Sequence, residues 1–107
     1  MLKPEIKRIN TPIGLLYDIT LQDINVRAGY DINGLAFSDE ILNLESVGLK
    51  LTRIYCRLHN QWRENNLTYC DETKDYGDKM RYIATLGHHC QELVCYGKHN
   101  PQINKEL

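Results

Sequence analysis

Two stretches of the chain carry apolar residues at intervals of three and four, and these intervals constrain the fold more than any other feature of the sequence. At about 100° per residue such positions fall on one face of a helix, and here charged and amide side chains take the opposite face. We therefore predict two long amphipathic helices, over about residues 38–65 and 69–97. The first stripe is Leu44, Val47, Leu51, Ile54, Tyr55, Leu58 and Trp62, and the second is Tyr76, Met80, Ile83, Gly87, Cys90 and Val94.

The two stripes agree on one antiparallel register. In an antiparallel hairpin, the numbers of facing residues add up to a constant. Trp62 with Tyr76 and Gly48 with Cys90 both give 138, as do the other facing pairs, and the midpoint of 69 falls in the expected turn. Two independent patterns that agree in this way predict a helical hairpin. The register also explains the helix-interior glycines Gly48 and Gly87 as points where the helices approach closely.

Residues with known end preferences mark the limits of this hairpin. Ser38 is the expected N-cap of the first helix, followed by two acidic residues at the positive end of the helix dipole. Asn65 and Asn66 suit a helix exit, and Thr68 or Asp71 can cap the second helix. Gly97 is the expected C-terminal stop.

Residues 1–37 carry two conflicting patterns. Thr11 and Pro12 resemble a helix start, and Arg27 followed by Gly29 resembles a helix end. Against this, the odd-numbered positions from Ile13 to Leu21 are apolar and alternate with polar ones, as in a strand. The punctuation slightly favours a helix. We predict a single mainly α domain over residues 1–107, a long hairpin with an N-terminal element packed across it. The alternative is an α+β fold with a small N-terminal β-hairpin or sheet.

Composition and charge limit the classes of protein to which the chain can belong. The 107 residues are 42% hydrophobic and 25% charged, with a net charge of −1, so no global field favours nucleic acid or an anionic membrane. No signal peptide or membrane-spanning segment is evident. Without secretory context, we expect the four cysteines to be reduced thiols and the protein to be cytoplasmic.

The predicted second helix carries a further apolar stripe, about 110° from the hairpin seam. A helix in a two-helix hairpin needs only one such stripe, so something must cover the other. Either residues 1–37 pack there, or it binds a partner protein or a second copy of the chain as a homodimer. A histidine in the stripe could make such binding pH-dependent. The partner-binding candidates are Tyr82, Leu86, His89, Leu93 and Tyr96.

Cysteine and histidine pairs raise the question of chemistry. Cys56 with His59, and Cys95 with His99, have spacings that could bring zinc ligands onto one helix face. The hairpin register separates His59 from His99 by roughly 30 Å, too far for one metal ion. Cys95 and His99 could also form a nucleophilic pair, but no orienting group or oxyanion site accompanies them. We predict no metal, no cofactor and no enzyme activity.

Two functional classes fit these features. The first is a small non-enzymatic protein-binding module, such as an accessory subunit or an inhibitor of a larger complex. Bacteriophages use inhibitors of this kind against host defence. The alternative is a helical nucleic-acid-binding regulator, whose phosphate contacts would come from Lys50, Arg53 and Arg57 on one face of the first helix. A solvated face is the commoner role for such a charge pattern, and we expect no membrane partner.

Overall fold

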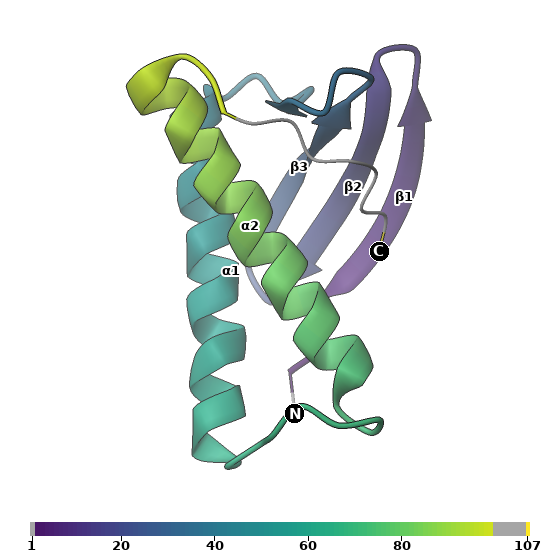
Figure 1. Cartoon of the computed structure of the whole chain (residues 1–107), viewed down its shortest axis with the longest axis vertical. Helices are drawn as coiled ribbons and strands as arrows, with labels where there is room; N and C mark the ends of the chain where they lie inside the picture. Colours follow the sequence, from purple (N-terminus) through teal and green to yellow (C-terminus); the bar gives the residue numbers. More distant parts are fainter. Residues whose placement is uncertain (1, 100–106) are drawn as a thin grey trace.

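The computed structural model describes residues 2–99 and residue 107, and it places a β-sheet before a pair of helices. Figure 1 shows the helices together on one side of the sheet. A hydrophobic core fills the space between these two layers. In chain order, the elements are β1 (Glu5–Thr11), β2 (Gly14–Leu21), β3 (Ile24–Asp31), β4 (Ala36–Phe37), α1 (Leu44–Glu64) and α2 (Lys74–Tyr96).

The N-terminal residues form an antiparallel sheet in the order β1-β2-β3-β4, so the prediction of a mainly α fold is wrong and the α+β alternative describes the chain. The misleading signal was the pair Thr11 and Pro12. The Thr11 hydroxyl closes the β1–β2 turn instead of capping a helix, accepting from the amides of Ile13 and Gly14 and donating to the Gly14 carbonyl. Arg27 and Gly29, the expected helix end, lie within β3.

Gly29 stands where two strands are packed most tightly. A Cβ atom at this position would lie 1.8 Å from the carbonyl oxygen of Leu15 on β2. Only a residue without a side chain fits this approach. The glycine that resembled a helix stop therefore permits the β2–β3 pairing.

The two faces of the sheet differ in character. On the core face, β2 and β3 contribute alternate apolar residues that pack against the helices. On the outer face, Lys7, Asp18 and Arg27 are aligned across three strands by the registers of β1 with β2 and of β2 with β3. The outer face is mixed, because it also carries Leu16, which is fully buried beside its register partners Ile9 and Gly29.

The hairpin register predicted from the sequence is confirmed. Trp62 stacks on Tyr76 with ring centroids 5.9 Å apart. A Cβ on Gly48 would lie 3.3 Å from Cβ of Cys90 at the opposite end of the hairpin. Both pairs have numbers that add up to 138. The Tyr76 hydroxyl also donates a buried 2.8 Å hydrogen bond to the Leu58 carbonyl.

The helices are shorter than predicted. Helix α1 begins at Leu44, and its N-cap is Asn43, whose side chain accepts from the amide of Ser46 at 2.9 Å. Ser38 instead donates to the Arg27 carbonyl and accepts from the Glu40 amide, which holds the loop before α1 against β3. Helix α2 begins at Lys74 instead of residue 69. It ends at Tyr96, and Gly97 caps it in the left-handed conformation, as predicted.

Candidate interaction surface

Most of the Tyr82–Tyr96 stripe lies between α2 and the sheet. Leu86 is fully buried and His89 is only 7% exposed. Tyr82 and Leu93 are half-buried against the core, whereas Tyr96 is 79% exposed. Residues 1–37 thus pack on this face, which was the first of the two alternatives for what covers the stripe. That the stripe binds a partner stays a prediction, and Tyr96 is its exposed member.

Aromatic rings fill the interface between α2 and the sheet. Tyr82 makes edge-to-face contacts with Tyr17 of β2 and Tyr30 of β3, at centroid distances of 5.4 and 6.1 Å. Such edge-to-face geometry adds to the stabilisation gained by burying the rings. The Tyr30 hydroxyl lies 2.7 Å from Nδ1 of His89. Burial lowers the pKa of His89 and raises the pKa of Tyr30, so both side chains stay uncharged near neutral pH.

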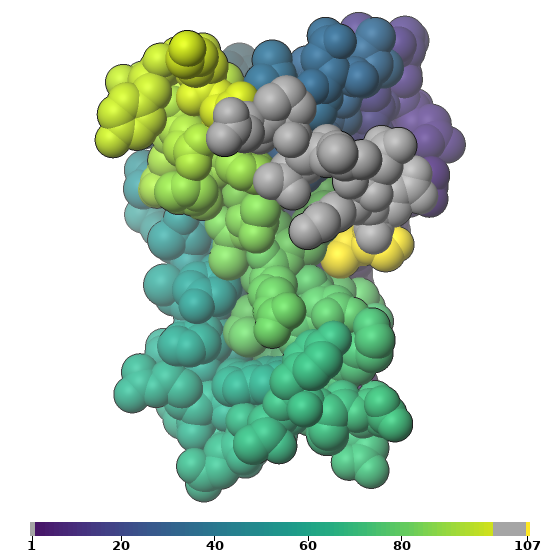
Figure 2. All heavy atoms as spheres, viewed as in Figure 1, coloured from purple at the N-terminus to yellow at the C-terminus, as the bar shows by residue number. Residues whose placement is uncertain are grey.

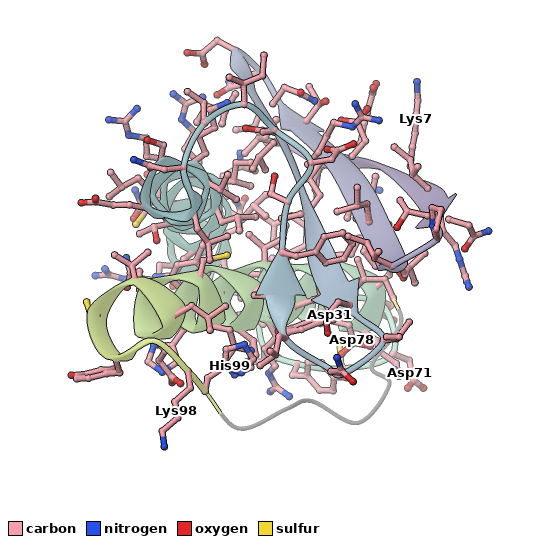
Figure 3. The ribbon with its side chains drawn as sticks, turned by 90° about the horizontal axis from the view of Figure 1, so that it is seen from above. Lys7, Asp31, Asp71, Asp78, Lys98 and His99 are labelled. Atoms are coloured by element: carbon pink, nitrogen blue, oxygen red, sulfur yellow. The ribbon has the colours of Figure 1, made fainter. Side chains whose placement is uncertain are left out.

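His99 extends this cluster beyond the end of α2. Its ring stacks on His89 with a centroid distance of 4.3 Å and an angle of 11° between the planes. Its Nε2 atom accepts a 3.1 Å hydrogen bond from the Ala36 amide on β4. Figure 3 shows His99 lying against the fold while its neighbour Lys98 points away. The sequence pattern paired His99 with Cys95 and did not reveal these contacts.

A different set of residues forms the exposed apolar surface of the molecule. Nine large hydrophobic residues are strongly exposed in the described part of the chain. Seven of them belong to segments at one end of the fold, which we call the apolar end. Its members are Ile13, Ile32, Ile41, Leu42, Leu49, Val94 and Tyr96.

Chain topology places the segments that carry these seven residues at the same end of the molecule. The β1–β2 and β3–β4 turns lie at the end of the molecule where α1 begins and α2 finishes, uppermost in Figure 1. The two turns are joined directly, because the Ile32 amide donates a 2.9 Å hydrogen bond to the Ile13 carbonyl. Ile32 is 81% exposed and Tyr96 is 79% exposed. Figure 2 shows the β3–β4 turn and the end of α2 on this same end.

The cationic face predicted on α1 is partly occupied by contacts within the molecule. Lys50 pairs with Glu40 at 3.4 Å and donates to the Asn25 carbonyl. Arg57 pairs with Asp23 at 2.7 Å, and it also donates to the side chain of Gln22. Arg53 is exposed. Nucleic-acid binding by this face stays a prediction, and it would require Lys50 and Arg57 to exchange these contacts for phosphates.

The predicted metal and nucleophile pairs have other neighbours in the structure. His59 stacks on Tyr55 of its own helix, whereas His99 packs in the cluster beside β4. Cys56 and Cys95 are exposed free thiols. Within residues 2–99 and 107, no three histidine, cysteine or acidic side chains converge on a point where they could hold a metal ion.

Comparison with known proteins gives no relative from which a function could be transferred. No family model, no curated protein and no solved structure matches the chain. Neither helix of the described residues is long and apolar enough to cross a membrane. The site must therefore be interpreted from its own geometry.

Proposed function

We propose that this protein is a non-enzymatic protein-binding module of the cytoplasm and that it contacts its partner through the apolar end. The observation that carries the proposal is the uneven placement of exposed apolar side chains, with seven of nine at one end of the fold. Exposed apolar surface gathered in one region is typical of protein interfaces, whereas single scattered residues are ordinary. Tyr96 adds an exposed aromatic side chain, a type enriched at such interfaces.

The way these residues are held also favours binding. The two isoleucine turns are braced by the hydrogen bond between the Ile32 amide and the Ile13 carbonyl. Val94 and Tyr96 lie on the last turn of a 23-residue helix. Side chains on a braced scaffold lose little conformational freedom when a partner binds. The role we propose is that of an accessory subunit or an inhibitor of a larger complex, of the kind that phages direct against host defence.

The test compares two variants in an affinity pull-down from the source cell. In the first, Ile32→Lys and Tyr96→Lys are combined, which places two charges on the apolar end without touching the core. In the second, Asn60→Lys and Glu64→Lys add lysines at the other end of α1, where both positions are exposed. We expect the wild type and the second variant to capture the same protein and the first variant to lose it.

Two outcomes would contradict this function. Equal capture by both variants would place the interface elsewhere. Recovery of nucleic acid, with an affinity that falls steeply with salt and is lost in Arg53→Gln, would favour the regulator alternative. A mass measurement of the free protein shows whether the partner is a second copy of the chain. Circular dichroism confirms that each variant is folded.

A further inference from the structure

We propose that residues 38–40 form an autoinhibitory strap, which covers the edge of β3 and prevents a second copy of the chain from adding a strand there. The inference is independent of the partner proposed for the apolar end. It begins from the unequal lengths of two neighbouring strands. Strand β3 has 8 residues, whereas β4 has 2 and pairs only with Gly29 and Tyr30. In the described part of the chain, no strand pairs with the rest of β3 on the side away from β2 (Figure 1).

Side chains take the place of a strand along this edge. In an antiparallel sheet, the residues that pair with one neighbouring strand direct both their N–H and C=O groups toward it. The Arg27 amide donates a 2.7 Å hydrogen bond to Oε1 of Glu40, and the Ser38 hydroxyl donates to the Arg27 carbonyl. Two residues earlier, the Asn25 carbonyl accepts a 3.0 Å hydrogen bond from Nζ of Lys50. These are the backbone groups with which a further strand would pair.

The side chains that cover the edge also hold one another in place. The Glu40 amide donates to the Ser38 hydroxyl at 3.1 Å, and Oε2 of Glu40 lies 3.4 Å from Nζ of Lys50. The Glu40 side chain is only 12% exposed, so water screens this ion pair weakly. Asp39 differs from its two neighbours, because its carboxylate lies 3.7 Å from the Arg27 guanidinium and thus contacts a side chain of β3. Ser38 and Glu40 are therefore the residues of the strap that occupy the backbone edge.

A cover on this edge has a physical reason. An open strand edge presents unpaired N–H and C=O groups, which are a template for pairing with another chain. At the opposite edge of the sheet, β1 carries the exposed residues Lys7 and Arg8, and their like charges oppose the approach of a second copy. Between Ile24 and Gly29, β3 carries one charged residue, Arg27. The strap supplies the protection that charge provides at β1.

Without the strap, the edge of β3 is complementary to the same edge of a second copy. A twofold axis at Val26 places Asn25 of one copy opposite Arg27 of the other, and both residues direct backbone groups away from β2. Each such pair can exchange two hydrogen bonds, and no like charges face each other. The same axis places Ile24 opposite Ala28, an apolar pair on the core side. This symmetry favours a second copy as the occupant of the edge.

The test measures the mass of strap variants of the full chain by sedimentation velocity over a range of concentrations. Ser38→Ala combined with Glu40→Ala removes both side-chain bonds to the Arg27 backbone. We expect this double variant to reach twice the wild-type mass at high concentration.

Amide hydrogen exchange by NMR reports on the edge itself. In a dilute sample of the double variant, protection of the Arg27 amide should fall about tenfold, the equivalent of one lost hydrogen bond. In a concentrated sample the protection should return, because the second copy then supplies the acceptor.

Two matched variants separate the strap from a general effect of substitution. Asp39→Ala removes a carboxylate from the same segment, but this carboxylate contacts the Arg27 side chain and not the backbone edge. Ser38→Thr combined with Glu40→Gln retains the hydroxyl donor and a side-chain acceptor. Both variants should keep the wild-type mass at every concentration.

The proposal is wrong if the double variant keeps the wild-type mass at all concentrations, or if it associates while the Arg27 amide stays exposed. Association of Asp39→Ala to the same extent would also contradict it. A bound segment of another protein, seen as added mass, would show that a second copy is not the occupant. Glu40→Ala alone serves if the double variant does not fold, and it should associate more weakly. Unfolding of this variant as well would refute the strap as a removable cover.

Discussion

At the scale of single residues, the structure assigns a stringent steric role to Gly29. An added Cβ would lie 1.8 Å from the Leu15 carbonyl oxygen, and a backbone atom cannot move aside as a side chain can. We expect Gly29→Ala to lower the free energy of unfolding by about 2 kcal/mol or more, as overpacking does. Gly48→Ala is the matched control. Its Cβ would meet the Cys90 side chain at 3.3 Å, and the gain in helix propensity of about 1 kcal/mol offsets that contact.

Urea denaturation of the two variants measures this difference. A loss in Gly29→Ala no larger than the change in Gly48→Ala would mean that β2 and β3 can separate slightly at little cost. The strand pairing would then be looser than the structure has it. The comparison tests the one glycine whose role the sequence pattern misassigned.

Thiol reactivity is a second property of individual residues. Cys90 is fully buried, which raises its pKa to about 12, so it carries almost no thiolate near neutral pH. Hydrogen bonds from Thr73 lower the pKa of the exposed Cys70. Because the thiolate is the nucleophile, we expect iodoacetamide at pH 7.5 to modify Cys70 first and Cys90 only after unfolding. Peptide mass spectrometry follows each site, and early labelling of Cys90 would show that the core opens readily.

At the scale of secondary-structure elements, one side-chain hydrogen bond caps the N-terminus of α1. Asn43 provides the acceptor for the Ser46 amide, one of the helix-terminal donors that has no partner within the helix. Asn43→Ala should therefore lower the free energy of unfolding by about 1 kcal/mol, whereas Asn43→Asp should preserve it. Thermal unfolding of both variants measures the effect. Equal loss in the two would indicate that the acceptor oxygen does not stabilise the helix.

The elements differ in how far the sequence determined them. The hairpin could be predicted, register included, because each helix buries one stripe against the other and the spacing records that burial directly. The N-terminal strands could not, because Thr11 and Pro12 serve a turn as well as they serve a helix start. Local propensity was ambiguous there, and strand pairing with β2 decided the outcome. The prediction of Ser38 as a cap is wrong for a related reason, since the Arg27 carbonyl to which it donates lies 11 residues away in sequence.

At the scale of the whole molecule, the apolar end and the histidine cluster both depend on contacts between residues that are far apart in sequence. His99 accepts from the Ala36 amide, which is 63 residues away in sequence. The Ile32 amide donates to the Ile13 carbonyl because the antiparallel strands bring the two turns together. The sequence did predict that the second stripe of α2 needed a cover. It could not show that the sheet supplies this cover and leaves Tyr96 outside.

The buried cluster gives the whole fold a dependence on pH. The pKa of His89 is lowered in the folded state, so below the unfolded value of about 6.5 the unfolded chain binds more protons than the folded chain. The free energy of unfolding should therefore be constant above about pH 7 with respect to this group. It should fall as the pH decreases from 6.5 toward the lower folded value, by at most about 1.4 kcal/mol per pH unit. Urea midpoints between pH 7.5 and 5.0 measure the slope.

Two variants assign that slope to its source. His89→Gln cannot take up a proton, so its stability should vary less between pH 7.5 and 5.0, even though its absolute stability differs from that of the wild type. His59→Gln should keep the wild-type slope. Asp23 and Asp78 also have lowered pKa values, but carboxylates of this kind lose their contribution only at more acidic pH. An unchanged slope in His89→Gln would mean that another group, and not the cluster under the end of α2, couples folding to pH.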